Sequence, residues 1–181
     1  PGPGQVTITG VTYTGSGCPP GTAHISISPD WAKFTLIFDS FGLKLPEAHK
    51  DCTLNFQVSY PLGYQFTISK IDYTGYVLLG LGVTAKQTSS HWFSGFVGDK
   101  QTFQSTLYGP YSGQYSGHYI LPGPLPGAVW SPCGASTTVN INTQLFLNSN
   151  KPNSPGMINI SSNGSKMQYQ YAYDLNWRTC K

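Results

Sequence analysis

The chain has 181 residues, which fits one domain with a substantial buried core, and only 9% of its residues are charged. The formal net charge is +3, and it comes from few charged residues. The sequence contains no cluster of lysines and arginines, which argues against a nucleic-acid interface built on phosphate contacts. No apolar run approaches the ~20 residues that span a bilayer, and an aromatic content of 14% argues against disorder. We therefore expect a single domain over residues 1–181.

The first strands are predicted from alternating apolar and polar residues over 5–9, 23–28 and 33–38. In the third of these, Phe34, Leu36 and Phe38 share one face, which we assign to the core. Residues 40–50 form a loop with weak helical tendency that is too short to propagate without support.

Residues 54–69 predict a β-hairpin with the three-residue loop Pro61-Leu62-Gly63. Proline presets φ for a type I turn, and glycine supplies the left-handed residue of a G1 bulge. If Tyr60 pairs with Tyr64, Phe56 and Val58 share an apolar face with Phe66 and Ile68. We expect an antiparallel sheet with one wet face here.

Later strands follow the same alternation, whereas residues 109–128 are rich in glycine and proline and predict little regular structure. Further strands are predicted over 71–83, 91–96, 102–108, 139–147, 157–160 and 167–177. No segment carries an amphipathic helical pattern over three turns. The fold class is therefore all-β: an antiparallel β-sandwich, jelly-roll-like, with little or no helix.

The chain opens on Pro1-Gly2-Pro3-Gly4 without an initiator methionine, and we expect a mature secreted chain with a flexible start at 1–4. Four cysteines fit two disulfides and an oxidising compartment. Three connectivities are possible, and we predict Cys18–Cys52 and Cys133–Cys180 because both close local loops. A metal site is the alternative, although no C-x-x-C pair is present.

Two sequons near the C-terminus, which begin at Asn159 and Asn163, predict N-glycosylation. Asn153-Ser154-Pro155 is no sequon, because proline occupies the position that needs serine or threonine. We expect a glycoprotein.

A set of local motifs runs through nearly the whole chain. They are Gly17-Cys18-Pro19, Phe38-Asp39, the Cys52 strand leading to Tyr60-Pro61 and Gly63-Tyr64, Gly75-Tyr76, Trp130-Ser-Pro-Cys-Gly134 and Trp177-Arg178-Thr179-Cys180. Together they resemble a family of small secreted, mostly fungal, disulfide-bonded proteins catalogued as a domain of unknown function. The resemblance implies an extracellular protein with all four cysteines in structural roles, and it brings no activity. Asp51 and Thr74 depart from the family pattern, which has asparagine and arginine there.

Catalytic residues are scarce. A glycosidase needs two carboxylates facing one cleft, and Asp30 and Asp39, which flank one predicted strand, are the candidates for such a pair. Asp30, in a Ser-Pro-Asp turn, is more simply explained as a residue that hydrogen-bonds its own backbone. The four histidines show no metal-binding spacing, and no motif for a cofactor is present. The sequence predicts neither a metal nor a cofactor.

The most suggestive surface is aromatic. Residues 108–119 place tyrosines every three or four positions in a predicted glycine-rich loop. Tyrosine rings can stack on the apolar faces of sugars while their hydroxyl groups hydrogen-bond. We predict a ligand-binding surface from this loop and a neighbouring tryptophan: Tyr108, Tyr111, Tyr115, His118, Tyr119 and Trp92. The alternative is that these rings pack back over the edge of the sandwich.

Taken together, these patterns predict an extracellular binding protein that recognises cell-wall carbohydrate or an extracellular protein partner, without nucleic acid and without a membrane span. A hydrolase of wall polymers acting through Asp30 and Asp39 is the rival from another class, and a structural wall component is a third hypothesis. The ligand, the enzymatic status and the oligomeric state stay open.

Overall fold

The computed structural model describes residues 5–122 and 126–180, so the expected flexible start at 1–4 lies outside the described residues. The described chain is built from antiparallel strands, with one turn of 3-10 helix, η1 (Val97–Asp99). The strands are β1 (Thr7–Thr14), β2 (Ala23–Ile27), β3 (Lys33–Phe38), β4 (Leu43–Lys44), β5 (His49–Leu79), β6 (Val83–Phe93), β7 (Gln101–Tyr108), β8 (Tyr111–Ile120), β9 (Gly134–Ser149), β10 (Gly156–Ile158) and β11 (Tyr169–Thr179). This confirms the all-β class.

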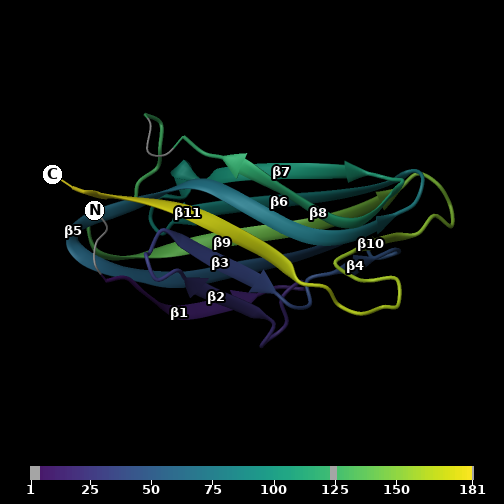
Figure 1. Ribbon diagram of the computed structural model, residues 1–181, viewed down its shortest axis with the longest axis horizontal. Helices are drawn as coiled ribbons and strands as arrows, with labels where there is room; N and C mark the ends of the chain where they lie inside the picture. Colours follow the sequence, from purple (N-terminus) through teal and green to yellow (C-terminus); the bar gives the residue numbers. More distant parts are fainter. Residues whose placement is uncertain (1–4, 123–125, 181) are drawn as a thin grey trace.

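Strand β5 organises the fold, because it belongs to both layers of the sandwich (Figure 1). Its first half, up to Ser59, pairs with β1 on one side and β9 on the other. Its second half, from Tyr64, pairs with β11 and then with β8 and β10. We call β2-β3-β11-β5-β8, with β4 and β10 at one end, sheet I, and β1-β5-β9-β6-β7 sheet II.

The predicted hairpin over residues 54–69 is wrong. Tyr60 and Tyr64 do not pair, because non-local strands occupy the hydrogen-bonding edges on both sides of the turn. Gly63 does adopt the expected positive φ, 85°, but it bends β5 from one sheet to the other. The apolar face was nonetheless predicted correctly, since Phe56 and Phe66 are fully buried. These two rings face the core from opposite sheets rather than from one.

Residues 109–128 were also predicted wrongly, because β8 occupies ten of them. Gly117 of this strand is needed for packing rather than for a loop, because a Cβ there would lie 2.4 Å from the Tyr73 hydroxyl oxygen. The weak helical tendency over 40–50 is likewise not realised, since these residues form β4, a turn and the start of β5.

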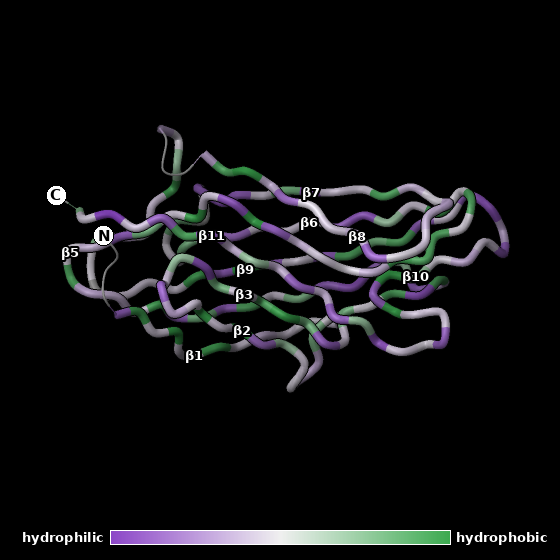
Figure 2. Tube along the Cα trace, in the orientation of Figure 1, coloured by the Kyte–Doolittle hydropathy of each residue, from purple (hydrophilic) through white to green (hydrophobic). Residues whose placement is uncertain are grey.

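The core lies between the two sheets and comes from the predicted alternation, which Figure 2 shows as interleaved hydrophobic and hydrophilic residues along the strands. Phe34, Leu36 and Phe38 are buried as predicted. Phe34 stacks on Tyr173 of the neighbouring strand with ring centroids 4.4 Å apart, and it meets Phe56 of sheet II edge-on at 5.3 Å. Such offset and edge-on contacts are the favoured geometries of aromatic pairs.

Both predicted disulfides are confirmed. Cys18 is bonded to Cys52, with 34 residues of sequence separation, and Cys133 to Cys180, with 47. The first ties the segment after β1 to β5, and the second ties the start of β9 to the end of β11. Each bond removes conformational freedom from the unfolded chain. No free cysteine is present in the part of the chain that the structure describes.

Candidate binding surface

The outer face of sheet I is polar and is made by the alternate residues of β11, β5 and β8 that point away from the core. Gln170 of β11 lies beside Thr74 of β5, which lies beside Ser116 of β8. In the next row, Asp72 lies beside His118. Neighbouring polar side chains on adjacent strands are close enough to act on one ligand together.

An open groove of about 570 Å³ lies at one end of this face, and we call it the amide groove. It is lined by Thr74, Gly75, Tyr76, Gln114, Met167, Gln168 and Gln170. Its three glutamine amides offer both donors and acceptors, and the threonine adds a hydroxyl. The half-buried Tyr76 contributes an aromatic ring. None of the described residues that line the groove carries a carboxylate or an amine, so its chemistry suits a neutral, hydroxyl-rich ligand.

The other end of the same face carries a row of alternating charges. Asp174 lies 3.4 Å from the Lys33 ammonium and 3.6 Å from that of Lys70, and Lys70 lies 3.7 Å from Asp72. Since two lysines alternate with two aspartates, this row has no net charge. A second open groove, of about 580 Å³, includes Lys33 and Asp174 together with Asp30. The face as a whole therefore does not favour a polyanion.

The aspartates proposed for a hydrolase are not brought together. Asp30 lies in the turn before β3 and Asp39 follows its other end. Hydrogen bonds from the Ser28 hydroxyl, at 2.6 Å, and from the Ala32 amide lower the pKa of Asp30. Asp39 is half-buried, and its carboxylate lies 2.7 Å from His24. A general acid needs a raised pKa, whereas that of Asp30 is lowered. A glycosidase also needs two carboxylates that face one cleft, and Asp30 and Asp39 lie at opposite ends of β3.

The predicted tyrosine surface lies at a strand edge rather than in a loop. Tyr108 ends β7 and is 73% exposed, while Tyr111 and Tyr119, near the two ends of β8, are 41% and 38% exposed. Tyr119 stacks on Phe103 of β7 with ring centroids 5.2 Å apart. His118 points to the outer face of sheet I, away from these rings. The structure thus spreads the tyrosines along one side of the sandwich.

Tyr115 does not belong to any surface, because it is 8% exposed and points into the core. There it joins Tyr169 and Tyr171, whose hydroxyl groups both donate to the side-chain carbonyl of Gln87, the latter at 2.8 Å. Burial raises the pKa of all three tyrosines. This buried polar layer explains why aromatic residues in this chain need not be ligand contacts.

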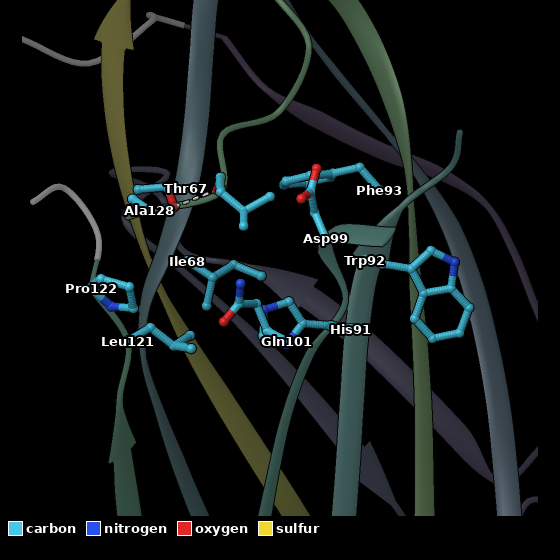
Figure 3. A pocket seen from close by; sticks show the side chains of 11 residues that line it. Thr67, Ile68, His91, Trp92, Phe93, Asp99, Gln101, Leu121, Pro122 and Ala128 are labelled. Atoms are coloured by element: carbon cyan, nitrogen blue, oxygen red, sulfur yellow. Dashed lines mark hydrogen bonds between the residues drawn. The ribbon is translucent and has the colours of Figure 1, made fainter. Parts of the chain in front are cut away.

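Trp92 is also separate from the tyrosines. It lies on the outer face of sheet II, since its neighbours His91 and Phe93 are buried. The Lys100 ammonium sits 4.4 Å from the centre of its indole ring, a cation–π contact. In Figure 3 the indole points away from the cluster formed by His91 and Gln101.

A small recess lies behind Trp92, between β5, β6 and the segments after β8 (Figure 3). Its cavity of about 10 Å³ accommodates about one water molecule. His91, Asp99 and Gln101 line it among apolar neighbours such as Ile68. His91 is 7% exposed, and burial lowers the pKa of its imidazole to about 4. The imidazole is thus neutral at pH 7.

Within residues 5–122 and 126–180, no three His, Cys, Asp or Glu side chains gather closely enough to hold a metal ion. The same part of the chain contains no helix long and apolar enough to cross a membrane.

The two sequons differ. Asn159 is fully buried: its amide nitrogen donates to the Phe41 carbonyl at 2.9 Å, and its amide oxygen accepts from the Tyr76 backbone N–H at 3.0 Å. A glycan on that nitrogen has no room in this fold, so the structure argues against the predicted glycosylation of Asn159. Asn163 is exposed in a turn and stays a predicted glycosylation site.

Sequence reasoning missed the amide groove. The alternation around Tyr169 and Tyr171 already implied that Gln168 and Gln170 point outward. The alternation did not show that Gln114 lies on the same face, because the glycines and prolines of residues 109–128 predict a loop there. It also could not show that the face is hollowed between β11 and β8.

The chain matches a family model described as "Domain of unknown function (DUF4360)" over residues 4–180. It is 36% identical over 188 residues to an uncharacterized secreted protein from Arthroderma benhamiae, and the match covers 99% of this chain and 74% of that protein. The two disulfides also fit an extracellular location. This is a secreted, disulfide-bonded protein.

Solved structures resemble the chain only distantly. TmCBM61 in complex with β-1,4-galactotriose gives a TM-score of 0.31 at 9% identity, covering 94% of this chain and 88% of that one. The family 11 carbohydrate-binding module from Clostridium thermocellum gives 0.25 at 11% identity, covering 94% and 87%. Murine APRIL gives 0.31 at 12%, covering 78% and 98%. TM-scores this low carry no argument about function. The family assignment rests on the family model and the relative from Arthroderma: the chain belongs to the DUF4360 family.

Proposed function

We propose that this secreted protein binds a neutral polysaccharide of the extracellular matrix or cell wall along the outer face of sheet I. The observation that carries the proposal is the amide groove, in which Gln114, Gln168 and Gln170 come together from β8 and the last part of the chain. Amide side chains can both donate to and accept from sugar hydroxyl groups.

Two further features support a neutral, extended ligand. The charged row beyond the groove has no net charge, because Lys33 and Lys70 are paired with Asp174 and Asp72. The face is also long: the eight residue-to-residue steps from Gln168 to Asn176 span roughly 26 Å of extended chain at about 3.3 Å per step. That length suits an oligosaccharide rather than a single sugar. Tyr76 offers a ring on which a sugar can stack.

The test is binding to a glycan array and to insoluble polysaccharides, with reducing ends assayed in the same tubes. The double variant Q168A/Q170A should weaken binding about tenfold, because two hydrogen bonds of roughly 0.5–1.5 kcal/mol each are lost. Gln104 is an exposed glutamine of β7 outside the groove, so Gln104→Ala is the matched control and should bind as the wild type does.

Three outcomes would count against the proposal. Retention of no polysaccharide would remove the carbohydrate function altogether. Binding that survives Q168A/Q170A but disappears in Tyr108→Ala would move the site to the tyrosine edge. New reducing ends would favour the hydrolase alternative and direct attention to the groove that contains Asp30 and Asp174.

A further inference from the structure

Strand β8 is an edge strand that lacks the usual protection against pairing with another chain. Among the described residues 5–122 and 126–180 it pairs with β5 alone, and its register from residue 111 to 120 runs without a bulge. Its ten residues contain no Asp, Glu, Lys, Arg or Pro. Proteins normally blunt edges with charge, proline, bulges or short length. Here β1 has a register shift between Thr9 and Thr12, and the edge strand β2 has only five residues.

The backbone groups that β8 leaves unpaired can be identified from its ladder with β5. The Leu121 N–H, just past the strand, donates to the Ser69 carbonyl at 3.0 Å and continues the register of the ladder. Bonded residues alternate in an antiparallel pair, so the odd-numbered residues of β8 are bonded to β5. The even-numbered residues, among them Gln114 and Ser116, therefore direct their N–H and C=O groups to the free edge.

The sequence of β8 is self-complementary about Tyr115, since residues 111–119 read Tyr-Ser-Gly-Gln-Tyr-Ser-Gly-His-Tyr. An antiparallel second copy centred on Tyr115 sets tyrosine 111 against tyrosine 119, and glycine 113 against glycine 117. Ser112 then faces His118 of the second copy, and Gln114 faces Ser116. These last two pairs are even-numbered, so they bond through the groups that β8 leaves free.

The side chains agree with this register. Tyr111 and Tyr119 keep about two fifths of their surface exposed, and aromatic pairs directly opposite on neighbouring strands stabilise sheets. No like charges meet across the axis. Strand β7 lies along the same side of the molecule as β8 (Figure 1) and also carries no charged residue from Gln101 to Tyr108, so β7 adds no charge repulsion.

We propose that a second copy of this chain adds its β8 antiparallel to β8, so that the two copies of sheet I form one continuous sheet with a two-fold axis at Tyr115. Such an interface is isologous, the commonest kind in closed dimers. It extends the outer face of sheet I across the axis but does not depend on the proposed polysaccharide function.

The test is the mass of the full chain, produced without glycan in a bacterial periplasm, by light scattering and sedimentation over a range of concentrations. The wild type should approach twice 19.6 kDa as concentration rises. The variant S112K/H118K places lysines opposite each other across the axis and should return to the mass of a monomer. S112E/H118K places opposite charges there and should keep the dimer. Both positions are exposed and lie outside the amide groove.

Residues 112 and 118 of one chain are roughly 20 Å apart along the strand, so a direct charge contact between these two positions requires the second copy. Near-ultraviolet circular dichroism and the unfolding midpoint check that both variants are folded. A wild type that stays at 19.6 kDa at every concentration overturns the proposal. So does a folded S112K/H118K that stays dimeric, or equal loss of the dimer in both variants.

Discussion

Replacing His91 with leucine should remove an acid-sensitive contribution to folding. His91 is buried on the inner face of β6, with the Tyr173 ring 6.2 Å away. The carboxylate that shares its recess, Asp99, is exposed to solvent, and Gln101 beside it is uncharged. Burial therefore dominates and lowers the pKa of His91 to about 4. In the unfolded chain the imidazole titrates near its ordinary pKa of about 6.5.

The direction of the change in stability with pH follows from proton linkage. Because the native state binds the proton more weakly, the unfolded state takes up more protons as the pH falls below about 6.5, and stability drops. The contribution of the neutral, buried His91 to the free energy of unfolding is complete above about pH 6.5. It declines as the pH falls, until the native pKa of about 4 is reached. The loss relative to pH 7 amounts to about 2 kcal/mol at pH 5 and about 3 kcal/mol at pH 4.

The assay is urea unfolding of the wild type and of His91→Leu at pH 7, 6, 5 and 4. Between pH 7 and pH 5, the free energy of unfolding of the wild type should fall by about 2 kcal/mol more than that of the variant. His118→Gln is the control, because His118 lies exposed on β8 rather than in the core. Parallel pH profiles for the wild type and His91→Leu would refute the reasoning, whatever the stability of the variant at pH 7.

Two further predictions follow from close packing and from burial. A Cβ on Gly109 would lie 1.9 Å from the backbone carbonyl oxygen of Gly80, so Gly109→Ala should lower the free energy of unfolding by about 2 kcal/mol or more; Gly98→Ala, whose Cβ meets no atom within 4 Å, should change it by less than about 0.5 kcal/mol in the same denaturation experiment. Secretion from a eukaryotic host should yield protein glycosylated at Asn163 alone, because Asn159 is fully buried; mass spectrometry of Asn163→Gln should therefore show no glycan, and a remaining glycan on Asn159 would contradict the structure.

Local patterns in the sequence were sufficient for the strand class, the buried faces and the disulfides. The side-chain period of two marks Phe34 and Tyr171 as inward residues whatever their partners are, because alternation is a property of the extended chain itself. The cysteine pairing was predictable because the two loops closed by the disulfides are local.

Strand partnership was not predictable from local signals. The turn at Gly63 has the backbone conformation that its residue type favours, yet whether it closes a hairpin depends on which strands compete for the edges of β5. Those strands, β1, β9 and β11, come from distant parts of the chain. The same limit applies to β8. Its glycines suggested a loop, yet Gly117 is required because Tyr73 of the neighbouring strand β5 leaves no room for a Cβ.

The candidate site likewise depends partly on local sequence and partly on tertiary structure. Sequence alone identified the residue types: a chain poor in charge and rich in amides, hydroxyls and tyrosines. Tertiary structure decided which of them share a surface. It buried Tyr115, separated Trp92 from the other rings, and gathered Gln114 with Gln168 and Gln170. A binding surface is a set of neighbours on adjacent strands, and strand order is fixed by long-range pairing rather than by any local pattern.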